Sequence, residues 1–185
     1  MSFKDTVWWT RKARIQAAKR LQSNDFASQL ILLWYSSFTV CMSIYELKKP
    51  TDSGDFAIVM VILSVLILCA SLYISNRNFK ERAVSLKNCY EHLSELEGTL
   101  RNPSCNLIQA NSDYKTILGS SENHEDIDFK SALINEWLNT SKKDMGTLTR
   151  VPTIPNVIEV IAFTFGKYLI LTAFVGLPFL TLLVR

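Results

Sequence analysis

The chain has 185 residues, enough for one modest domain. Its formal net charge of +3 is small, so no bulk binding to nucleic acid is indicated. Charged residues crowd into 1–25 and 76–150, and the stretches between and after them are nearly uncharged. The four cysteines show no Cys-x-x-Cys pair or other metal-ligand spacing, so we expect free thiols.

Residues 1–25 form a basic amphipathic stretch, with six Lys and Arg residues against two Asp residues. They lack the apolar core of a cleavable signal peptide, so we expect internal helices to drive membrane insertion. Tryptophan and basic residues together suit a membrane interface, but packing against the protein's own cytosolic part is an equal alternative. The apolar positions that approximate one helical stripe are Val7, Trp8, Ile15, Ala18 and Leu21.

Two uncharged stretches follow, at 26–45 and at 56–75. The second reads FAIVMVILSVLILCASLYIS, and twenty helical residues extend about 30 Å, the thickness of a bilayer's hydrocarbon core. The break between them, ELKKPTDSGD, contains Pro50, Ser53 and Gly54, which favour a turn. Residues 26–75 are therefore predicted to form a transmembrane hairpin.

Each predicted span carries a line of small or polar residues at helical spacing. Such residues either join the two helices of the hairpin closely or line a water path in an oligomer, and both alternatives stay open. The candidate residues for pore lining or helix packing are Gln29, Ser36, Ser43, Ser64, Ser71 and Ser75.

Residues 76–140 are predicted to be a cytosolic helical domain. The second span is expected to continue into an amphipathic helix over 79–100, which Pro103 ends and whose near-heptad apolar spacing suits association of copies. A second helix is expected over 105–119, with Gly119 as its C-terminal cap. Asp126 or Asp128 is expected to cap a third helix.

Residues 141–156 read as a connector, and 157–185 as a C-terminal hydrophobic segment. From Tyr168 to Val184 there are seventeen uncharged residues, the short end of the spanning range. We favour a third transmembrane helix with a kink at Pro178, and an interfacial or re-entrant segment is the alternative. The fold class is therefore an all-α integral membrane protein.

Motifs for catalysis are missing from the sequence. The main ionisable cluster, SSENHEDID, contains one histidine, His124, and no second histidine lies near it. The chain has no phosphate-binding glycine loop, no HExxH and no nucleophile elbow. We therefore expect no enzyme activity, no cofactor and no metal site. An enzyme that uses the His124 loop is the remaining alternative.

Several segments together resemble the SLATT family, the two-transmembrane effectors associated with bacterial nucleotide-signalling and reverse-transcriptase defence systems. The resemblance covers about residues 8–140 and rests on ARIQAAKRL, SIYELK, FKERAVSLKNCYEHLSEL and YKTILGSSENHEDIDF. The last run is its most specific part. The C-terminal segment departs from a bare two-helix plan. The residues that match the motif region, with an implied structural or signal-coupling role, are Tyr114, Asn123, His124 and Asp128.

The resemblance implies a non-enzymatic effector of the bacterial inner membrane that oligomerises into a pore, or disrupts the membrane, and kills or arrests an infected cell. Its partners would be the lipid bilayer, further copies of itself, and a co-encoded reverse transcriptase or a nucleotide second messenger, with no direct nucleic-acid binding. The alternative is a membrane anchor or scaffold that tethers such a cytosolic partner.

Lys and Arg counts near the spans predict the topology. Six lie before the first span and four follow the second, but the hairpin loop carries two. Reporters at the N-terminus and after Ile127 should therefore both be cytoplasmic. Periplasmic labelling of either reporter would contradict this orientation.

Overall fold

The structure is a computed structural model that describes residues 2–50 and 54–184. All its regular elements within that part of the chain are helical, which confirms the all-α fold class. Ser53 of the predicted turn lies outside the described residues. The helices are α1 (Phe3–Lys48), α2 (Asp55–Asn76), α3 (Phe79–Thr99), α4 (Leu107–Gly119), α5 (Asp126–Asn139), the 3-10 helix η1 (Met145–Thr147), α6 (Ile154–Gly176) and the 3-10 helix η2 (Leu177–Val184).

The chain divides into two compact units. Unit 1 comprises the chain up to Ser23 together with Phe79–Phe163. Unit 2 comprises Asn24–Asn78 and the chain from Thr164 onward. The helices α1 and α6 each contribute to both units, so each unit is built from segments distant in sequence.

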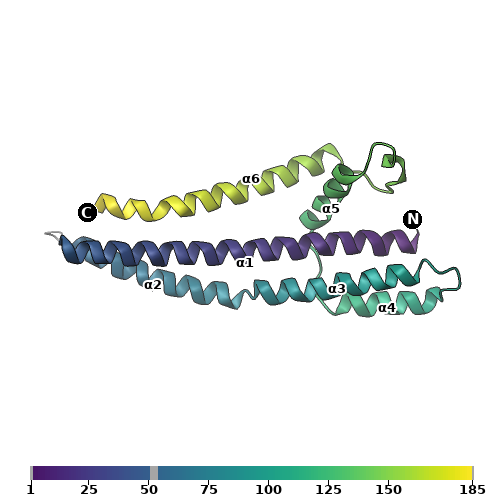
Figure 1. Cartoon of the computed structure of the whole chain (residues 1–185), viewed down its shortest axis with the longest axis horizontal. Helices are drawn as coiled ribbons and strands as arrows, with labels where there is room; N and C mark the ends of the chain where they lie inside the picture. Colours follow the sequence, from purple (N-terminus) through teal and green to yellow (C-terminus); the bar gives the residue numbers. More distant parts are fainter. Residues whose placement is uncertain (1, 51–53, 185) are drawn as a thin grey trace. The chain divides into compact units, whose positions relative to one another are not determined.

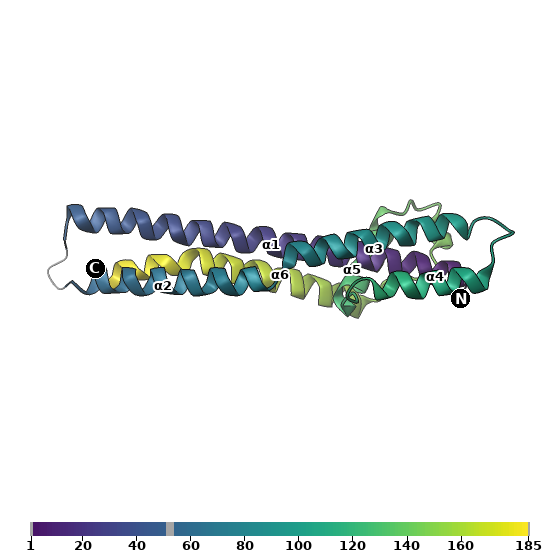
Figure 2. The same cartoon turned by 90° about the horizontal axis from the view of Figure 1, so that it is seen from below.

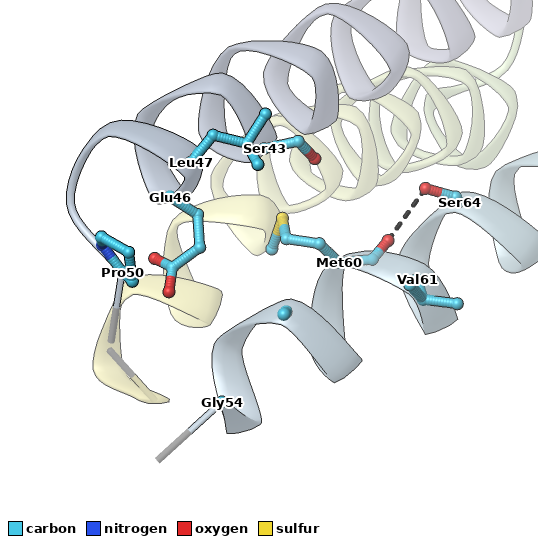
Figure 3. A pocket seen from close by; sticks show the side chains of 9 residues that line it. Ser43, Glu46, Leu47, Pro50, Gly54, Met60, Val61 and Ser64 are labelled. Carbon is cyan, nitrogen blue, oxygen red and sulfur yellow. Dashed lines mark hydrogen bonds between the residues drawn. The ribbon is translucent and has the colours of Figure 1, made fainter. Parts of the chain in front are cut away.

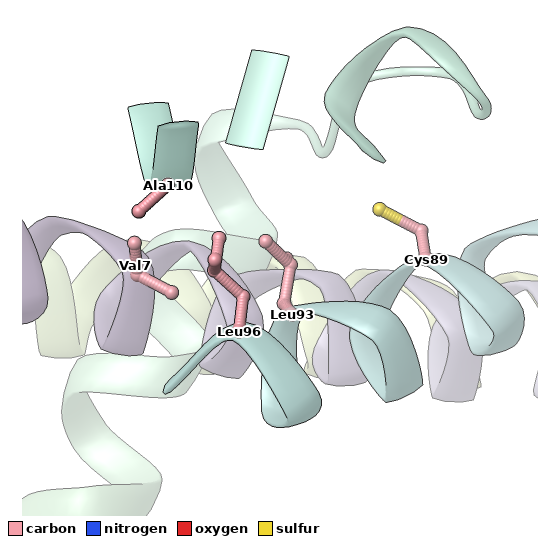
Figure 4. Close-up of a cluster of buried hydrophobic side chains, with 5 residues drawn as sticks. All are labelled: Val7, Cys89, Leu93, Leu96 and Ala110. Atoms are coloured by element: carbon pink, nitrogen blue, oxygen red, sulfur yellow. The ribbon is translucent and has the colours of Figure 1, made fainter. Parts of the chain in front are cut away.

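Unit 1 has a hydrophobic core formed by α1, α3 and α4. Val7 of α1, Leu93 and Leu96 of α3, and Ala110 of α4 meet in one cluster, with the Cys89 side chain beside them (Figure 4). The helices α3 and α4 lie side by side in both views of the chain (Figures 1 and 2). The apolar face of α3 is thus filled by its own chain. It is not free to join copies, contrary to the association expected from its near-heptad spacing.

The N-terminal part of α1 packs within unit 1, which decides between the two alternatives for 1–25. Trp9 is 1% exposed and Leu21 is 1% exposed, so this helix face is a protein core and not a membrane-binding face. The expected stripe is wrong at two positions, because Trp8 and Ile15 are only partly buried and Trp9 lies inside. Trp8 and Trp9 are adjacent, and only the tertiary packing distinguishes them.

We expected the second span to continue into the following helix, but the structure has a break between the two helices. The helix α2 ends at Asn76, and Asn78 adopts a left-handed conformation with φ 49° before α3 begins. Asparagine tolerates this conformation better than most residues. At the other end of α2, Gly54 has φ 70°, which glycine adopts without strain.

The cap predictions met mixed outcomes. The prediction that Gly119 is the C-terminal cap of α4 is wrong, because the capping residue is Ser120, in a right-handed conformation. The N-cap of α5 is Glu125, and not Asp126 or Asp128. Asp128 instead stands at the third position of α5, where it completes a capping box with Glu125.

Three helical segments within the described residues are long and apolar enough to cross a membrane. They lie in Phe3–Lys48, in Asp55–Thr99 and in Ile154–Leu182. The third segment begins at Ile154, within the predicted connector 141–156. Pro155 does not prevent this start, because in the first turn of a helix its missing N–H costs nothing. At Leu177, beside Pro178, the α-helix changes to a 3-10 helix.

Two side chains of α1 satisfy backbone carbonyls of α6 within unit 2. Proline has no N–H, so the carbonyl of Phe174, four residues before Pro178, loses its usual helical donor. The Tyr35 hydroxyl donates to this carbonyl at 2.9 Å, and Trp34 Nε1 donates to the carbonyl of Val175 at 3.1 Å. Because lipid offers no water to such carbonyls, these bonds attach α6 to the hairpin.

We expect Tyr35→Phe to destabilise the attachment of α6 by about 1 kcal/mol, the scale of hydrogen bonds inside membrane proteins. Reversible unfolding in mixed detergent micelles measures this loss. Tyr73→Phe, on an exposed tyrosine of α2, is the matched control. In a Pro178→Ala background, where a backbone N–H can bond Phe174, the Tyr35→Phe loss should shrink. An equal loss in both backgrounds would contradict the explanation.

Candidate functional site

The polar lines of the two spans do not join α1 to α2. Gln29, Ser36, Ser64 and Ser75 are exposed in the single chain, and Ser43 and Ser71 are half-buried. Within residues 2–50 and 54–184, no hydrogen bond links the predicted line on α1 to that on α2. Some of these side chains instead donate hydrogen bonds within their own helices. Gln29 donates to the carboxylate of Asp25, Ser64 to the carbonyl of Met60, and Ser71 to the carbonyl of Leu68.

Ser43 and Ser64 come together at one place, the closed end of the hairpin. Both line a cavity of about 500 Å³ that Glu46, Met60 and Gly54 also border (Figure 3). Glu46 is half-buried and its carboxylate points into the space between the two helices. The sequence pattern does not distinguish Glu46, because this residue stands in the stretch ELKKPTDSGD, which is predicted to be a loop.

In unit 1, Tyr114 and Asp128 attach later helices to the start of α1. The Tyr114 hydroxyl lies 2.9 Å from Thr10 Oγ1, and its ring meets Phe3 edge-on. Arg20 binds Asp128 through two parallel contacts, Nε to Oδ1 at 2.8 Å and Nη2 to Oδ2 at 3.0 Å. The structural role predicted for these two residues therefore has a specific geometry in each case.

Asp128 accepts hydrogen bonds both from the Arg20 side chain and from the backbone at the start of α5. Its side chain is 2% exposed, and Oδ2 also accepts from the backbone N–H of Glu125 at 2.9 Å. Arg20 further pairs with Glu125 at 2.9 Å. Burial alone lowers the pKa of Arg20, but the hydrogen bond to Asp128 and the charges of Asp128 and Glu125 raise that pKa above its ordinary value.

Asn123 and His124 occupy the loop that leads into α5. Asn123 Oδ1 accepts from the backbone N–H of His124 at 3.0 Å, and the His124 ring lies beside Phe129 with centroids 6.4 Å apart. Burial and the nearby charge of Arg14 lower the pKa of His124, against the opposing effect of Asp128 and Asp126. The imidazole Nδ1 is buried and has no hydrogen-bond partner among the described residues.

Arg14 is one of the six basic residues of 1–25, and no role beyond its charge is predicted for it. Its side chain is buried, and Nη1 donates to Ser121 Oγ at 2.6 Å and to the backbone carbonyl of Glu122. These acceptors lie just after the end of α4, where a cation is favourable. The sequence does contain a signal for this burial. Arg14 stands three, four and seven residues before Ala17, Ala18 and Leu21, and this helical spacing puts it on the buried face.

The described residues hold no group of three or more His, Cys, Asp or Glu side chains suited to a metal ion. What the arrangement provides is a junction of hydrogen bonds and ion pairs in unit 1, together with apolar helices that expose polar side chains.

We expect Asp128→Asn to destabilise unit 1 by about 3 kcal/mol, because it removes the buried charge of the Arg20–Asp128 pair and leaves the guanidinium paired with the exposed Glu125. Thermal unfolding of the purified chain, followed by circular dichroism, measures the effect. Asp113→Asn is the matched control, since Asp113 is exposed and accepts from Gln109 on its own helix. Equal stability of the two variants would contradict the role of the pair.

The lowered pKa of His124 predicts a pH dependence of stability. The ordinary value is 6.5, so near that pH the unfolded state binds more protons than the folded state. The contribution is therefore present above about pH 6.5 and is lost as the pH falls through the folded-state pKa. Between about pH 7.5 and about pH 5.5, His124→Gln should lose less stability than the parent. An equal loss in His124→Gln and in the parent would contradict this role of His124.

Comparison with known families places the chain. The model of the SMODS and SLOG-associating 2TM effector domain family 5 matches residues 1–183. No curated protein and no solved structure matches the chain. The match includes the C-terminal apolar segment, so this segment belongs to the family domain and is not a departure from it. The resemblance is confirmed, and the chain belongs to the SMODS and SLOG-associating 2TM effector domain family 5.

Proposed function

We propose that several copies of this membrane effector assemble into a pore that depolarises the membrane. The observation that carries the proposal is the outward position of the polar lines. Gln29, Ser36 and Ser64 are exposed on segments that fit the membrane, and they do not join α1 to α2. Polar side chains within spans are expensive in lipid and are typically turned toward other helices or water.

A single hairpin has no room for a water path, so conduction needs contact between copies. The apolar face of α3 is used within its own chain, which leaves the spanning segments as the surfaces for assembly. On these segments, small hydroxylic residues permit close approach of helices and hydrogen bonds between copies. Ser64 and Ser71 already bond their own helices, so each can face lipid in the single chain and a neighbour or water in the assembly.

The cellular setting follows from the family and from charge. We infer an antiviral role in the inner membrane of a bacterium, with the N-terminus and unit 1 in the cytoplasm, where most Lys and Arg residues lie. In the resting cell the pore must be closed or unassembled. A co-encoded reverse transcriptase or a nucleotide second messenger would trigger assembly by binding the two states with different affinity.

A membrane anchor for a cytosolic partner is the second candidate. It is favoured by the apolar residues at the start of α4, where Leu107 is 63% exposed and Ile108 is 85% exposed. Exposed apolar side chains in an aqueous part of a protein are typical of a docking surface. An anchor would need this surface and would not need the polar lines of the spans.

The pore and the anchor predict different ion flux across the membrane. Overexpression should drive assembly by mass action, depolarise the cell and halt growth, as a potential-sensitive dye and growth curves measure. Ser64→Leu and Ser71→Leu should abolish the flux without preventing insertion, because leucine fills the polar line. Ser37→Leu is the matched control, since Ser37 is exposed on α1 but lies off the line.

Normal membrane potential at high expression under triggering conditions would leave the anchor as the better account. Unchanged toxicity in both leucine variants would move the lining to α1 or α6.

A further inference from the structure

One face of α6 carries a row of side chains at heptad spacing, apolar except for one threonine. Its members recur at alternating intervals of four and three residues, the spacing of the contact positions in a coiled coil. All of them are exposed in the single chain. They are Ile154, Ile158, Ile161, Phe165, Tyr168 and Thr172. We call this row the α6 seam.

The rest of the chain covers a different face of α6. Val157, Val160 and Leu171 are half-buried, and at about 100° per residue they do not lie on the seam. The threonine of the seam donates its hydroxyl to the carbonyl of Tyr168 on its own helix, at 2.9 Å. The seam is therefore a continuous surface that the single chain leaves uncovered and that contains no unsatisfied hydroxyl at Thr172.

The three isoleucines of the seam lie in the part of α6 that belongs to unit 1. Ile154 is 77% exposed, and Ile158 and Ile161 are each 62% exposed. Glu159 stands between them and pairs with Lys130 of α5 at 2.6 Å. This pair holds the isoleucines beside a helix with charged side chains, and it balances the one charge that the sequence has from 154 to 166.

The length of this apolar segment indicates that the isoleucines extend beyond the hydrocarbon core. The helical residues Ile154–Leu182 number 29, which is about 43 Å at 1.5 Å per residue, against about 30 Å for the core of a bilayer. The tie between Glu159 and α5 identifies the isoleucine end as the end that extends. Lipid chains therefore do not cover these side chains, and an exposed apolar row outside lipid is typical of an interface.

A second copy of the same chain is the partner that fits the seam. Heptad spacing is specific for another helix, because knobs on one helix must meet holes on the other, whereas lipid imposes no period. The exposed side chains of the seam offer an area of the same order as the ~800 Å² that each partner contributes to a standard interface. With its one nearby charge already paired, the seam brings no repulsion between copies.

The orientation and the residue types also specify how copies meet. Copies that share one topology in a membrane present their α6 helices in parallel. Ile158 then occupies an a position of the heptad, and Ile154 and Ile161 occupy d positions. Isoleucine at both a and d favours three or more strands over two in parallel coiled coils.

We propose that the α6 seams of three or more copies pack into a parallel coiled coil that begins outside the hydrocarbon core and continues into it. This inference rests on the proposed assembly of copies and names the surface that joins them. The near-heptad face of α3 does not take this part, because its own chain fills it. The seam concerns contact between copies and assigns no lining to the water path.

Native mass spectrometry of the full-length chain, released from detergent micelles over a range of protein concentration, counts the copies. We expect oligomers of three or more. Ile158→Glu should raise the concentration at which they dissociate by about tenfold or more, because each copy loses the burial of an isoleucine and like charges meet. Ile108→Glu is the matched control, since Ile108 is an exposed isoleucine of unit 1 on α4, and it should assemble like the parent.

The second variant combines Ile154→Leu with Ile161→Leu and keeps the volume and apolarity of the seam. Leucine at d with isoleucine at a favours two strands, so the oligomers should shift to dimers. A face that only met lipid would not respond to this exchange. Circular dichroism checks that all variants keep the helix content of the parent.

Three results would each overturn the proposal: a monomer at every concentration, equal dissociation of Ile158→Glu and Ile108→Glu, or an unchanged oligomer number in the leucine variant. Failure of the pore is read separately. Oligomers that require the seam but leave the membrane potential normal would support the seam and contradict the pore. Depolarisation by a chain whose Ile158→Glu variant assembles like the parent would do the reverse.

Discussion

Asp128 is the side chain on which the arrangement of unit 1 most depends. A carboxylate that is 2% exposed needs hydrogen-bond partners, and Asp128 accepts three hydrogen bonds, two from Arg20 and one from the backbone of Glu125. These partners belong to different elements, since Arg20 is on α1 and Glu125 caps α5. The same group therefore starts one helix and fixes its position on another. The loop with Asn123 and His124, which leads into α5, is positioned as a result.

Unit 2 obeys a different constraint, because its surroundings are lipid. There a backbone carbonyl without a donor cannot turn to water, and Pro178 creates one at Phe174. Tyr35 supplies the missing donor, and Trp34 bonds the next carbonyl. Apolar packing adds to these bonds, since the Phe179 ring lies 6.0 Å from that of Trp34. Directional bonds therefore specify where α6 meets α1, while apolar contacts permit many positions.

The sequence predicted the features that depend on local pattern. Long uncharged stretches located the segments that fit a membrane, and Pro103 correctly separated α3 from α4. The break at Asn78 was missed, because a single left-handed residue leaves no gap in an apolar pattern. Contacts between distant segments were also missed. Nothing in the local sequence pairs Arg20 with Asp128 or Tyr35 with Phe174, and the polarity of the N-terminal stretch concealed that Arg14 lies inside.

The bonds from Trp34 and Tyr35 also bear on the order of assembly during synthesis. Both donors belong to the first span, and their acceptors lie near the end of the chain. The hairpin is therefore synthesised before the carbonyls of Phe174 and Val175 exist. In that interval the indole N–H and the tyrosine hydroxyl need other acceptors, because an unpaired donor is costly in lipid. Arrival of α6 replaces these temporary partners, so the synthesis of α6 is itself the event that completes the hydrogen bonds of unit 2.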